Sequence, residues 1–450
     1  MRFSPDIKLI GLFAVMAIAV SATALVLGWG PGIYYICILG ITAIGLADLY
    51  ASLSLPSKIC VIFPETVRMS RNRDAVLCFQ IQKHAAFPAR ITIGLPFPES
   101  RFKTVYEKKI FLSENMNTFD WPITGLKQGA SLMDVCHIQM PSRLGLWEIK
   151  TSEKIQCTLN VYPDMSKEKK SLAGLLTGAE YGIHTIKNIG KGREFEHLRE
   201  YLPGDMYEDI HWKATAKRGI PVTKIFQVEK TQNIYVMIDA SRLSARNAAA
   251  FSDQTARPIY AAESILEKFI TTALSIGLTA RQQGDNFGLG VFTDKMERFL
   301  LAGTRANHFN LCRDTLFTLE PRQVTPDFNE WITFVGNKIR KRSLIILLTS
   351  LDDPAIAENL LNHIHILGRR HLVMINMLNP ASANPLFSAD TIESIDDIYG
   401  HLAGHVQWHF LRKFEKSLSR MGIGFHLHSL PDLTVNIISK YMEIKQRQAL

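Results

Sequence analysis

Residues 233–241 read NIYVMIDAS, an apolar run that ends in Asp239 and a serine. The pattern predicts a buried strand with polar residues at its end. A second run of this kind, SLIILLTS at 343–350, is followed by Asp352 and Asp353. Ligands of open α/β sheets bind at the carboxyl ends of the strands, so any chemistry is expected at these two strand ends.

The chain from about Ile234 to its end alternates strands with helices. This order predicts an α/β fold with a parallel, Rossmann-like sheet and helices on both of its faces. Further strands are predicted at NFGLGVF (286–292), the short return strand MERFLL (296–301), HLVMINML (371–378) and GFHLHSL (424–430). Helices are predicted at about 257–283, 306–319, 327–341 and 393–421. One more helix is predicted after the strand at 343–350, and another at the end of the chain.

Residues 57–163 carry short apolar or alternating runs separated by Pro, Asn, Ser and Gly. Such spacing without helical periodicity predicts a small β-sandwich. Residues 164–192 are polar and then punctuated by glycine, which is typical of a linker or loop, and with the segment described below they make up residues 164–232. We therefore expect a membrane hairpin at 1–56, the sandwich, a linker with the segment described below, and the α/β domain at 233–450.

Two uncharged runs, Leu9–Leu27 and Gly32–Ala47, are separated by the turn sequence GWGP at 28–31. Crossing a bilayer takes about 18–20 apolar residues, which the second run reaches only if it extends past Asp48. The runs predict two N-terminal transmembrane helices. The alternative for the first run is a cleaved signal peptide, although its apolar part is longer than a usual signal core.

Basic residues flank the predicted hairpin on both sides. Arg2 and Lys8 precede it, Lys58 and Arg68 follow it, and the connecting turn has no charge. The positive-inside rule therefore predicts a multi-pass protein of the inner membrane with its soluble part in the cytoplasm. Asp48 is expected near the cytoplasmic interface, or else at a contact between the helices.

Composition excludes several classes of protein. The chain has 450 residues, a formal net charge of +9 and six scattered cysteines. The absence of close Cys pairs argues against a zinc ribbon or a disulfide framework. No dense Lys/Arg stripe with interleaved aromatics is present, so nucleic acid is not an expected partner, and the excess of positive charge suits an anionic membrane surface.

The segment GREFEHLREYLPGDMYEDIHWKATAK at 192–217 is the most specific motif of the chain. It resembles the bacterial family known as domain of unknown function 58, whose members are membrane-anchored and carry a von Willebrand factor A-like domain. Residues 142–147 (SRLGLW), 239–241 (DAS) and 441–445 (YMEIK) resemble other parts of that family. The resemblance implies a MoxR-type AAA+ ATPase as partner and a role in complex assembly or envelope maintenance, with no established reaction.

Within this signature segment (192–217), Leu202-Pro203-Gly204-Asp205 is a turn sequence. The segment mixes both charge signs around an aromatic residue. It is either an internally paired connection between the two domains or an exposed docking surface. Its candidate interaction residues are Arg193, Arg199, Tyr201, Gly204, Asp205, Asp209, Trp212 and Lys213.

The resemblance to A-type domains also implies a cation site with the pattern Asp-x-Ser-x-Ser, a later Thr and an Asp. Asp239 and Ser241 match, and Thr304 and Asp352 are the candidates for the later positions. Leu243 stands where the second serine is expected, and the central strand ends in Ser350 rather than in Asp. Oxygen ligands of this kind suit Mg²⁺, and the two departures weaken such a site.

Histidines supply the enzymatic alternative, a metal-dependent hydrolase. His401, His405 and His409 recur every four residues and share one face of a predicted helix. Leu402 stands where the zinc-protease motif needs its catalytic Glu, so a solvated or structural histidine face is the competing interpretation. His426 and His428 alternate on one strand and are expected to be structural.

The sequence thus predicts a non-enzymatic interaction or adaptor protein anchored in the inner membrane. Its strand-end loops, with Asp239, Ser241, Thr304 and Asp352, are expected to face a protein partner. A metal-dependent hydrolase and a receptor with its domain outside the cell remain the alternatives.

Overall fold

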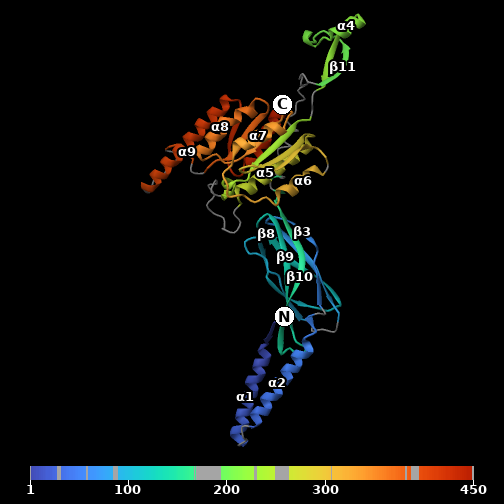
Figure 1. Cartoon of the computed structure of the whole chain (residues 1–450), viewed down its shortest axis with the longest axis vertical. Helices are drawn as coiled ribbons and strands as arrows, with labels where there is room; N and C mark the ends of the chain where they lie inside the picture. Colours follow the sequence, from blue (N-terminus) through green and yellow to red (C-terminus); the bar gives the residue numbers. More distant parts are fainter. Residues whose placement is uncertain are drawn as a thin grey trace. The chain divides into compact units, whose positions relative to one another are not determined.

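A computed structural model describes residues 2–27, 32–56, 59–84, 90–166, 168, 194–227, 231–248, 263–305, 307–380, 383–386 and 395–447 (Figure 1). The chain divides into two compact units, Met1–Asp164 and Met165–Leu450.

The second unit contains the predicted α/β sheet. Six strands lie in the order β15-β14-β13-β16-β17-β18. All neighbours are parallel except β14 and β15, which are antiparallel. This is the doubly wound order, with the strand order reversing between β13 and β16. The strands are β13 (Asn233–Asp239), β14 (Asn286–Phe292), β15 (Met296–Gly303), β16 (Leu344–Leu348), β17 (Leu372–Leu378) and β18 (Gly424–His428).

Helices cover both faces of this sheet, as the alternating pattern predicted. Apolar side chains of α5, α6 and α10 form one core with β13, and those of α7, α8 and α9 form the other. The central strands are apolar on both faces because each face is covered. The helices are α5 (Ile265–Gln282), α6 (His308–Leu316), α7 (Phe328–Lys338), α8 (Pro354–Gly368), α9 (Ile395–Arg420) and α10 (Leu433–Gln446).

A buried carboxylate ties the last helix to this domain. Asp285 accepts a hydrogen bond from the Tyr441 hydroxyl, and its Oδ2 lies 2.7 Å from Lys445 Nζ. Its Oδ1 accepts from the backbone N–H of Gln232 at 2.9 Å. The C-terminal motif YMEIK thus supplies two of the partners that satisfy a carboxylate which would be costly to bury alone.

The first unit contains the predicted β-sandwich (Figure 1). One sheet has the order β1-β10-β9-β5-β7 with β3 beside β10, and the other has the order β2-β4-β8-β6. Alternate side chains of both sheets meet in one core, which includes Phe79, Trp121 and Ile138. The strands are β1 (Arg2–Pro5), β2 (Ile59–Ile62), β3 (Thr66–Ser70), β4 (Asp74–Lys83), β5 (Arg90–Gly94), β6 (Phe102–Thr104), β7 (Glu107–Phe111), β8 (Met116–Gly125), β9 (Gly129–Pro141) and β10 (Trp147–Tyr162).

Two helices, α1 (Ile7–Leu27) and α2 (Gly32–Ser52), form where the two apolar runs were predicted. Within the residues that the structure describes, no helix combines the length and the hydrophobicity needed to cross a bilayer. The side chains of 22–34 lie outside those residues. The helices are therefore confirmed as helices, and their prediction as membrane spans is not confirmed.

The hydrogen-bond partners described for Asp48 of α2 lie in the sandwich and not in the other helix, whereas its position near the cytoplasmic interface stays a prediction. Its carboxylate is buried and accepts hydrogen bonds from Ser142 Oγ at 2.5 Å and from the backbone N–H of Leu144 at 3.0 Å. Ser52 Oγ accepts from the N–H of Arg143, and Trp147 Nε1 donates to the carbonyl of Gly45. The SRLGLW motif is thus the turn between β9 and β10 that fastens the end of α2 to the sandwich.

We predict that Asp48→Ala lowers the free energy of unfolding of the first unit by about 2–3 kcal/mol, because the buried Ser142 hydroxyl and Leu144 N–H lose their acceptor. Urea unfolding of the full chain, followed by tryptophan fluorescence, measures this change. Asp134→Ala, at an exposed position of β9, is the matched control and is expected to change stability by less than about 0.5 kcal/mol. Equal unfolding curves for the two variants would contradict the role of Asp48.

Candidate functional site

The reversal of strand order between β13 and β16 locates the candidate site. Ile238 of β13 lies beside Leu348 of β16, so Asp239 and Thr349 follow at the same edge of the sheet. In doubly wound sheets the crevice at this edge is where ligands bind. We call the group formed by Asp239, Ser241, Arg246, Thr349 and Asp352 the switch-point site.

The carboxylate of Asp239 is buried at this site, and each of its oxygens accepts a hydrogen bond. Its Oδ1 accepts from the N–H of Ser241 at 2.9 Å, and its Oδ2 accepts from Thr349 Oγ1 at 2.6 Å. Burial raises the pKa of Asp239, and these hydrogen bonds together with the charge of Arg246 oppose that rise. Asp239, at the end of β13, thus connects its own strand to the end of the neighbouring strand β16.

The loop after β13 is fixed by its own serines. Ser241 caps the short 3₁₀ helix η3 (Arg242–Ala245) by accepting from the N–H of Leu243. Ser244 Oγ donates to the carbonyl of Asp239 at 2.6 Å. Asp239 and Ser241 are 1% and 0% exposed, so neither side chain presents itself to a partner, which corrects the expectation that they would.

Asp352 is neutralised by an arginine that the sequence reasoning did not select. Arg246 Nη1 and Nη2 donate to the two oxygens of Asp352 at 2.5 and 3.0 Å. Asp353 caps α8 by accepting from the N–H of Ala355. Both aspartates after β16 therefore already have structural partners.

Thr304 does not belong to this site, which corrects its prediction as a ligand. β15 runs antiparallel to β14, and Gly303 at its end lies beside Phe287 near the start of β14. Asp239 lies beside Phe292 at the other end of the same strand. Five residues of strand separate the two positions by roughly 16 Å.

These residues do not fit a divalent cation. A Mg²⁺ site needs ionised carboxylates with free lone pairs. Asp352 is bound at both oxygens by a guanidinium, both oxygens of Asp239 accept hydrogen bonds, and Thr304 lies elsewhere. Across the described part of the chain, no group of three His, Cys, Asp or Glu side chains could hold a metal.

Residues 194–227, which we call the hairpin module, contain most of the signature segment. Its strands β11 (Glu194–Glu200) and β12 (Val222–Gln227) are antiparallel. Between them, the N–H of Asp205 bonds to the carbonyl of Leu202, and Gly204 has a φ of 111°. This is the predicted turn, of the type that requires glycine at its third position.

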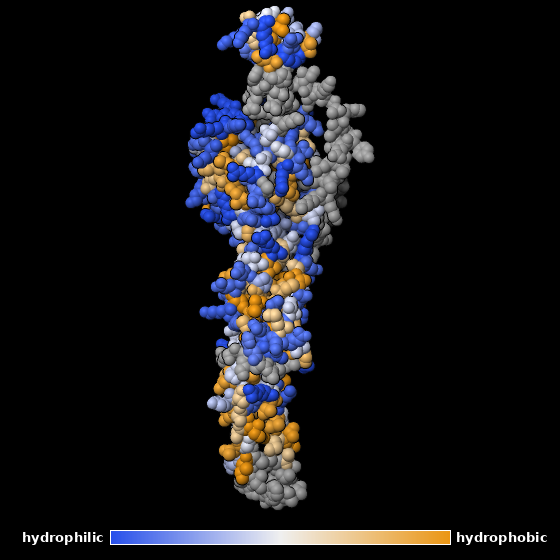
Figure 2. All heavy atoms as spheres, turned by 90° about the vertical axis from the view of Figure 1, so that its right-hand side faces the viewer, coloured by the Kyte–Doolittle hydropathy of each residue, from blue (hydrophilic) through white to orange (hydrophobic). Residues whose placement is uncertain are grey.

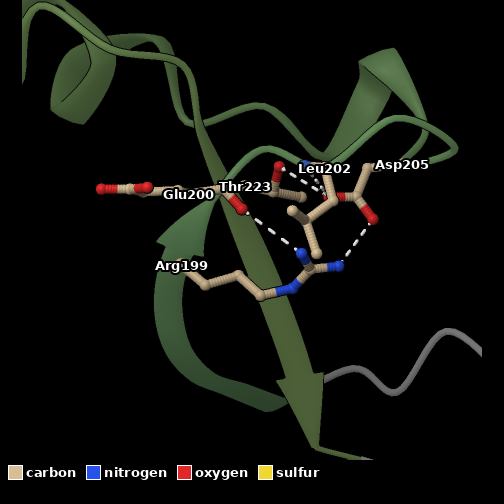
Figure 3. A network of polar contacts seen from close by, with 5 residues as sticks. All are labelled: Arg199, Glu200, Leu202, Asp205 and Thr223. Carbon is tan, nitrogen blue, oxygen red and sulfur yellow. Dashed lines mark hydrogen bonds and ion pairs between the residues drawn. The ribbon is translucent and has the colours of Figure 1, made fainter.

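Asp205 holds the module together (Figure 3). Its Oδ1 lies 2.6 Å from Arg199 Nη2, and its Oδ2 accepts from the N–H of Leu202 at 3.0 Å and from Thr223 Oγ1 at 3.4 Å. The Leu202 bond, followed by the charge of Arg199, keeps the pKa of Asp205 below its usual range. The ion pair is thus internal to the module and fixes its turn.

The other predicted residues of the signature segment have separate positions. Tyr201 packs its ring against Tyr207, with centroids 6.3 Å apart. Asp209 ends the 3₁₀ helix η2 (Tyr207–Asp209), and the exposed residues Trp212 and Lys213 begin α4 (Trp212–Arg218). Arg193 lies outside the described residues.

The predicted histidine face of α9 makes local contacts. His405 Nδ1 accepts from the N–H of Leu386 at 3.1 Å, and its ring stacks on Trp408. His401 is half-buried and His409 exposed. Together with the lack of a metal-binding group among the described residues, these contacts give no support to the hydrolase alternative.

A cavity of about 450 Å³ lies at the sheet edge formed by β18, between α9 and α10. It is lined by both histidines of β18 and by the ion pairs Arg412–Glu415 and Lys440–Glu443. His428 Nε2 lies 3.0 Å from Asn376 Oδ1. Burial, followed by the charge of His426, lowers the pKa of His428 to about 4, and Asp432 opposes this shift. His428 is therefore a neutral structural residue.

This pKa predicts a stability that falls with acid. Because folding lowers the pKa of His428 from 6.5 to about 4, its contribution is complete above pH 6.5 and is lost as pH falls toward 4. Between pH 7.5 and 4.5 the wild type should lose about 2–3 kcal/mol more than His428→Gln, as measured by urea unfolding. His409→Gln, at an exposed position, should behave as the wild type, and a His428→Gln variant with unchanged pH dependence would contradict the assignment.

Several known proteins show weak similarity to this chain. Solved structures with similarity include the SpRpn10 VWA domain (12% identity, TM-score 0.26, covering 45% of this chain and 93% of that chain). They also include BatB from Bacteroides thetaiotaomicron (12%, 0.30, 48% and 99%) and the PilB minor pilin from Streptococcus sanguinis (10%, 0.30, 80% and 88%). At these scores the neighbours carry no argument about function. A search of curated proteins found no match.

The family model described as "Protein of unknown function DUF58" matches residues 197–385. The matched range includes most of the hairpin module and the whole switch-point site. This part of the chain therefore matches the DUF58 family, in agreement with the resemblance that the sequence predicted.

Proposed function

We propose that this chain is a membrane-anchored adaptor that acts through protein contacts, with the hairpin module as its docking surface. The partner class that the family resemblance implies is a MoxR-type AAA+ ATPase. The observation that carries the proposal is the set of large apolar side chains that the module exposes.

Five such side chains lie between residues 202 and 220 of the module. Trp212 is 65% exposed and Tyr207 is 74% exposed. The set consists of Leu202, Met206, Tyr207, Trp212 and Ile220. Exposed aromatic and apolar residues concentrated in so short a segment are typical of a protein-binding surface, and Trp and Tyr are enriched among residues that dominate binding energy.

The module is also rigid enough to present these side chains. Asp205 joins the turn to Arg199 and Thr223, and the imidazole Nδ1 of His211 accepts from the N–H of Ala214 at the start of α4. Gly219 ends α4 with a φ of 70°. Because the internal ion pair fixes the backbone, less conformational entropy is lost when a partner binds. The polar residues of the signature segment thus hold the module itself together, and its apolar residues are available for contact.

Membrane anchoring by α1 and α2 is the second element of the proposal. The described apolar side chains of these helices are largely exposed, with Ile7 at 82% and Leu39 at 72%. Figure 2 shows hydrophobic residues over most of the visible surface of this helical pair. A helix that is apolar on all sides needs either a protein core or a lipid environment around it. We propose that lipid surrounds this pair and that the soluble part lies in the cytoplasm.

For the docking surface, we predict that Trp212→Ala weakens binding of the detergent-solubilised chain to the MoxR-type ATPase of the same genome on the order of 10–30-fold. The reason is that a truncated aromatic anchor loses its buried contact area. Surface plasmon resonance with immobilised chain measures the dissociation constant.

Leu301→Ala is the matched control, because Leu301 of β15 is exposed to a similar extent, 62%. It should bind as the wild type does. Asp205→Ala should weaken binding as well, because the turn loses its acceptor. Unchanged affinity of the Trp212 variant would contradict the docking surface, and no affinity of the wild type would contradict the choice of partner.

For the anchor, we predict that Val15→Asp combined with Leu39→Asp releases the chain from the membrane fraction into the carbonate-soluble fraction. A carboxylate in the middle of an apolar helix is costly in hydrocarbon, by about 2.5–3.5 kcal/mol on insertion scales. Leu132→Asp, at an exposed position of β9, should leave the chain in the membrane. Carbonate-soluble wild-type chain would rule out the anchor.

A further inference from the structure

Arg246 connects the two loops that meet at the switch point. It follows η3 in the loop after β13, and its bidentate partner Asp352 lies in the loop after β16. Its Nε donates to the carbonyl of Leu243 at 2.9 Å, which fixes the direction of the side chain. The guanidinium is thus held from both loops.

The same loop is also tied to the second carboxylate of the site. Ser244 Oγ of η3 donates to the carbonyl of Asp239 at 2.6 Å, and Arg246 follows η3 directly. The loop that carries the guanidinium is therefore fixed to the end of β13, while the guanidinium itself binds Asp352.

A fixed guanidinium can do at the switch-point site what a bound cation would do there, which is to neutralise and orient a carboxylate. It carries a permanent positive charge and binds a carboxylate through two parallel N–H···O bonds. Mg²⁺ would need the same oxygens, and Asp352 has both of its oxygens on Arg246. Binding of a cation and binding of the guanidinium are therefore mutually exclusive at Asp352.

We propose that the Arg246 guanidinium takes the place of the divalent cation at the switch point, so that the loops after β13 and β16 are held together without metal. This inference does not rest on the proposed docking surface, which lies on the hairpin module. It makes the state of these loops independent of the Mg²⁺ concentration.

The test is isothermal titration of Mn²⁺ into the purified full chain and its variants. The wild type is expected to show no binding at the switch-point site. Arg246→Ala frees the oxygens of Asp352 and is expected to gain a site with a dissociation constant on the order of 10⁻⁴–10⁻³ M, the range of weakly held carboxylate sites. The gained site should disappear in Arg246→Ala combined with Asp352→Asn.

Arg242→Ala removes an exposed arginine of the same loop and is the matched control, with no gain expected. Arg246→Lys keeps the charge and should also gain nothing. If Arg246→Ala does not fold, Arg246→Gln gives the same comparison. Wild-type binding of Mn²⁺ that is lost in Asp352→Asn would overturn the proposal, and so would a folded Arg246→Ala or Arg246→Gln variant without a gained site.

Discussion

The buried carboxylate of Asp239 is the contact on which the switch point depends. It lies at the end of β13 and accepts one hydrogen bond from its own loop and one from Thr349 at the end of β16. A carboxyl group buried away from water needs such partners, and here they come from both sides of the reversal in strand order. Asp239 thereby joins the ends of the two strands, and the Arg246–Asp352 pair adds a second connection between the loops that follow them.

The same solution recurs at two other buried aspartates. Asp48 joins α2 to the turn after β9, and Asp285 joins α10 to the loop before β14. In each case the carboxylate lies in one element and its partners come from a distant part of the sequence. Three of the motifs that resemble the family, at 142–147, at 239–241 and at 441–445, thus have structural roles as connections between elements.

Much of the fold could be predicted, because periodicity and strand-end residues are local signals. The α/β domain agrees with its predicted element order, and the two packed sheets of the first unit agree with the predicted sandwich. Thr304 was assigned to the wrong edge, although the predicted return strand before it already implied that the chain travels back to the start of β14. Arg246 was missed because the search considered only oxygen ligands. The partner of Asp48 was beyond reach, since it lies more than ninety residues further along the chain.

The α/β domain and the hairpin module thus differ in how their charged and apolar side chains are used. At the switch-point site the charges of Arg246 and Asp352 pair with each other, while the hairpin module leaves Trp212 and its apolar neighbours exposed. The most direct measurement of the central claim is a crystal structure of the wild-type chain grown in excess MnCl₂, with anomalous data collected for manganese. The account predicts an intact Arg246–Asp352 pair and no anomalous peak at Asp352. A manganese peak at Asp352, with Arg246 displaced, would contradict it.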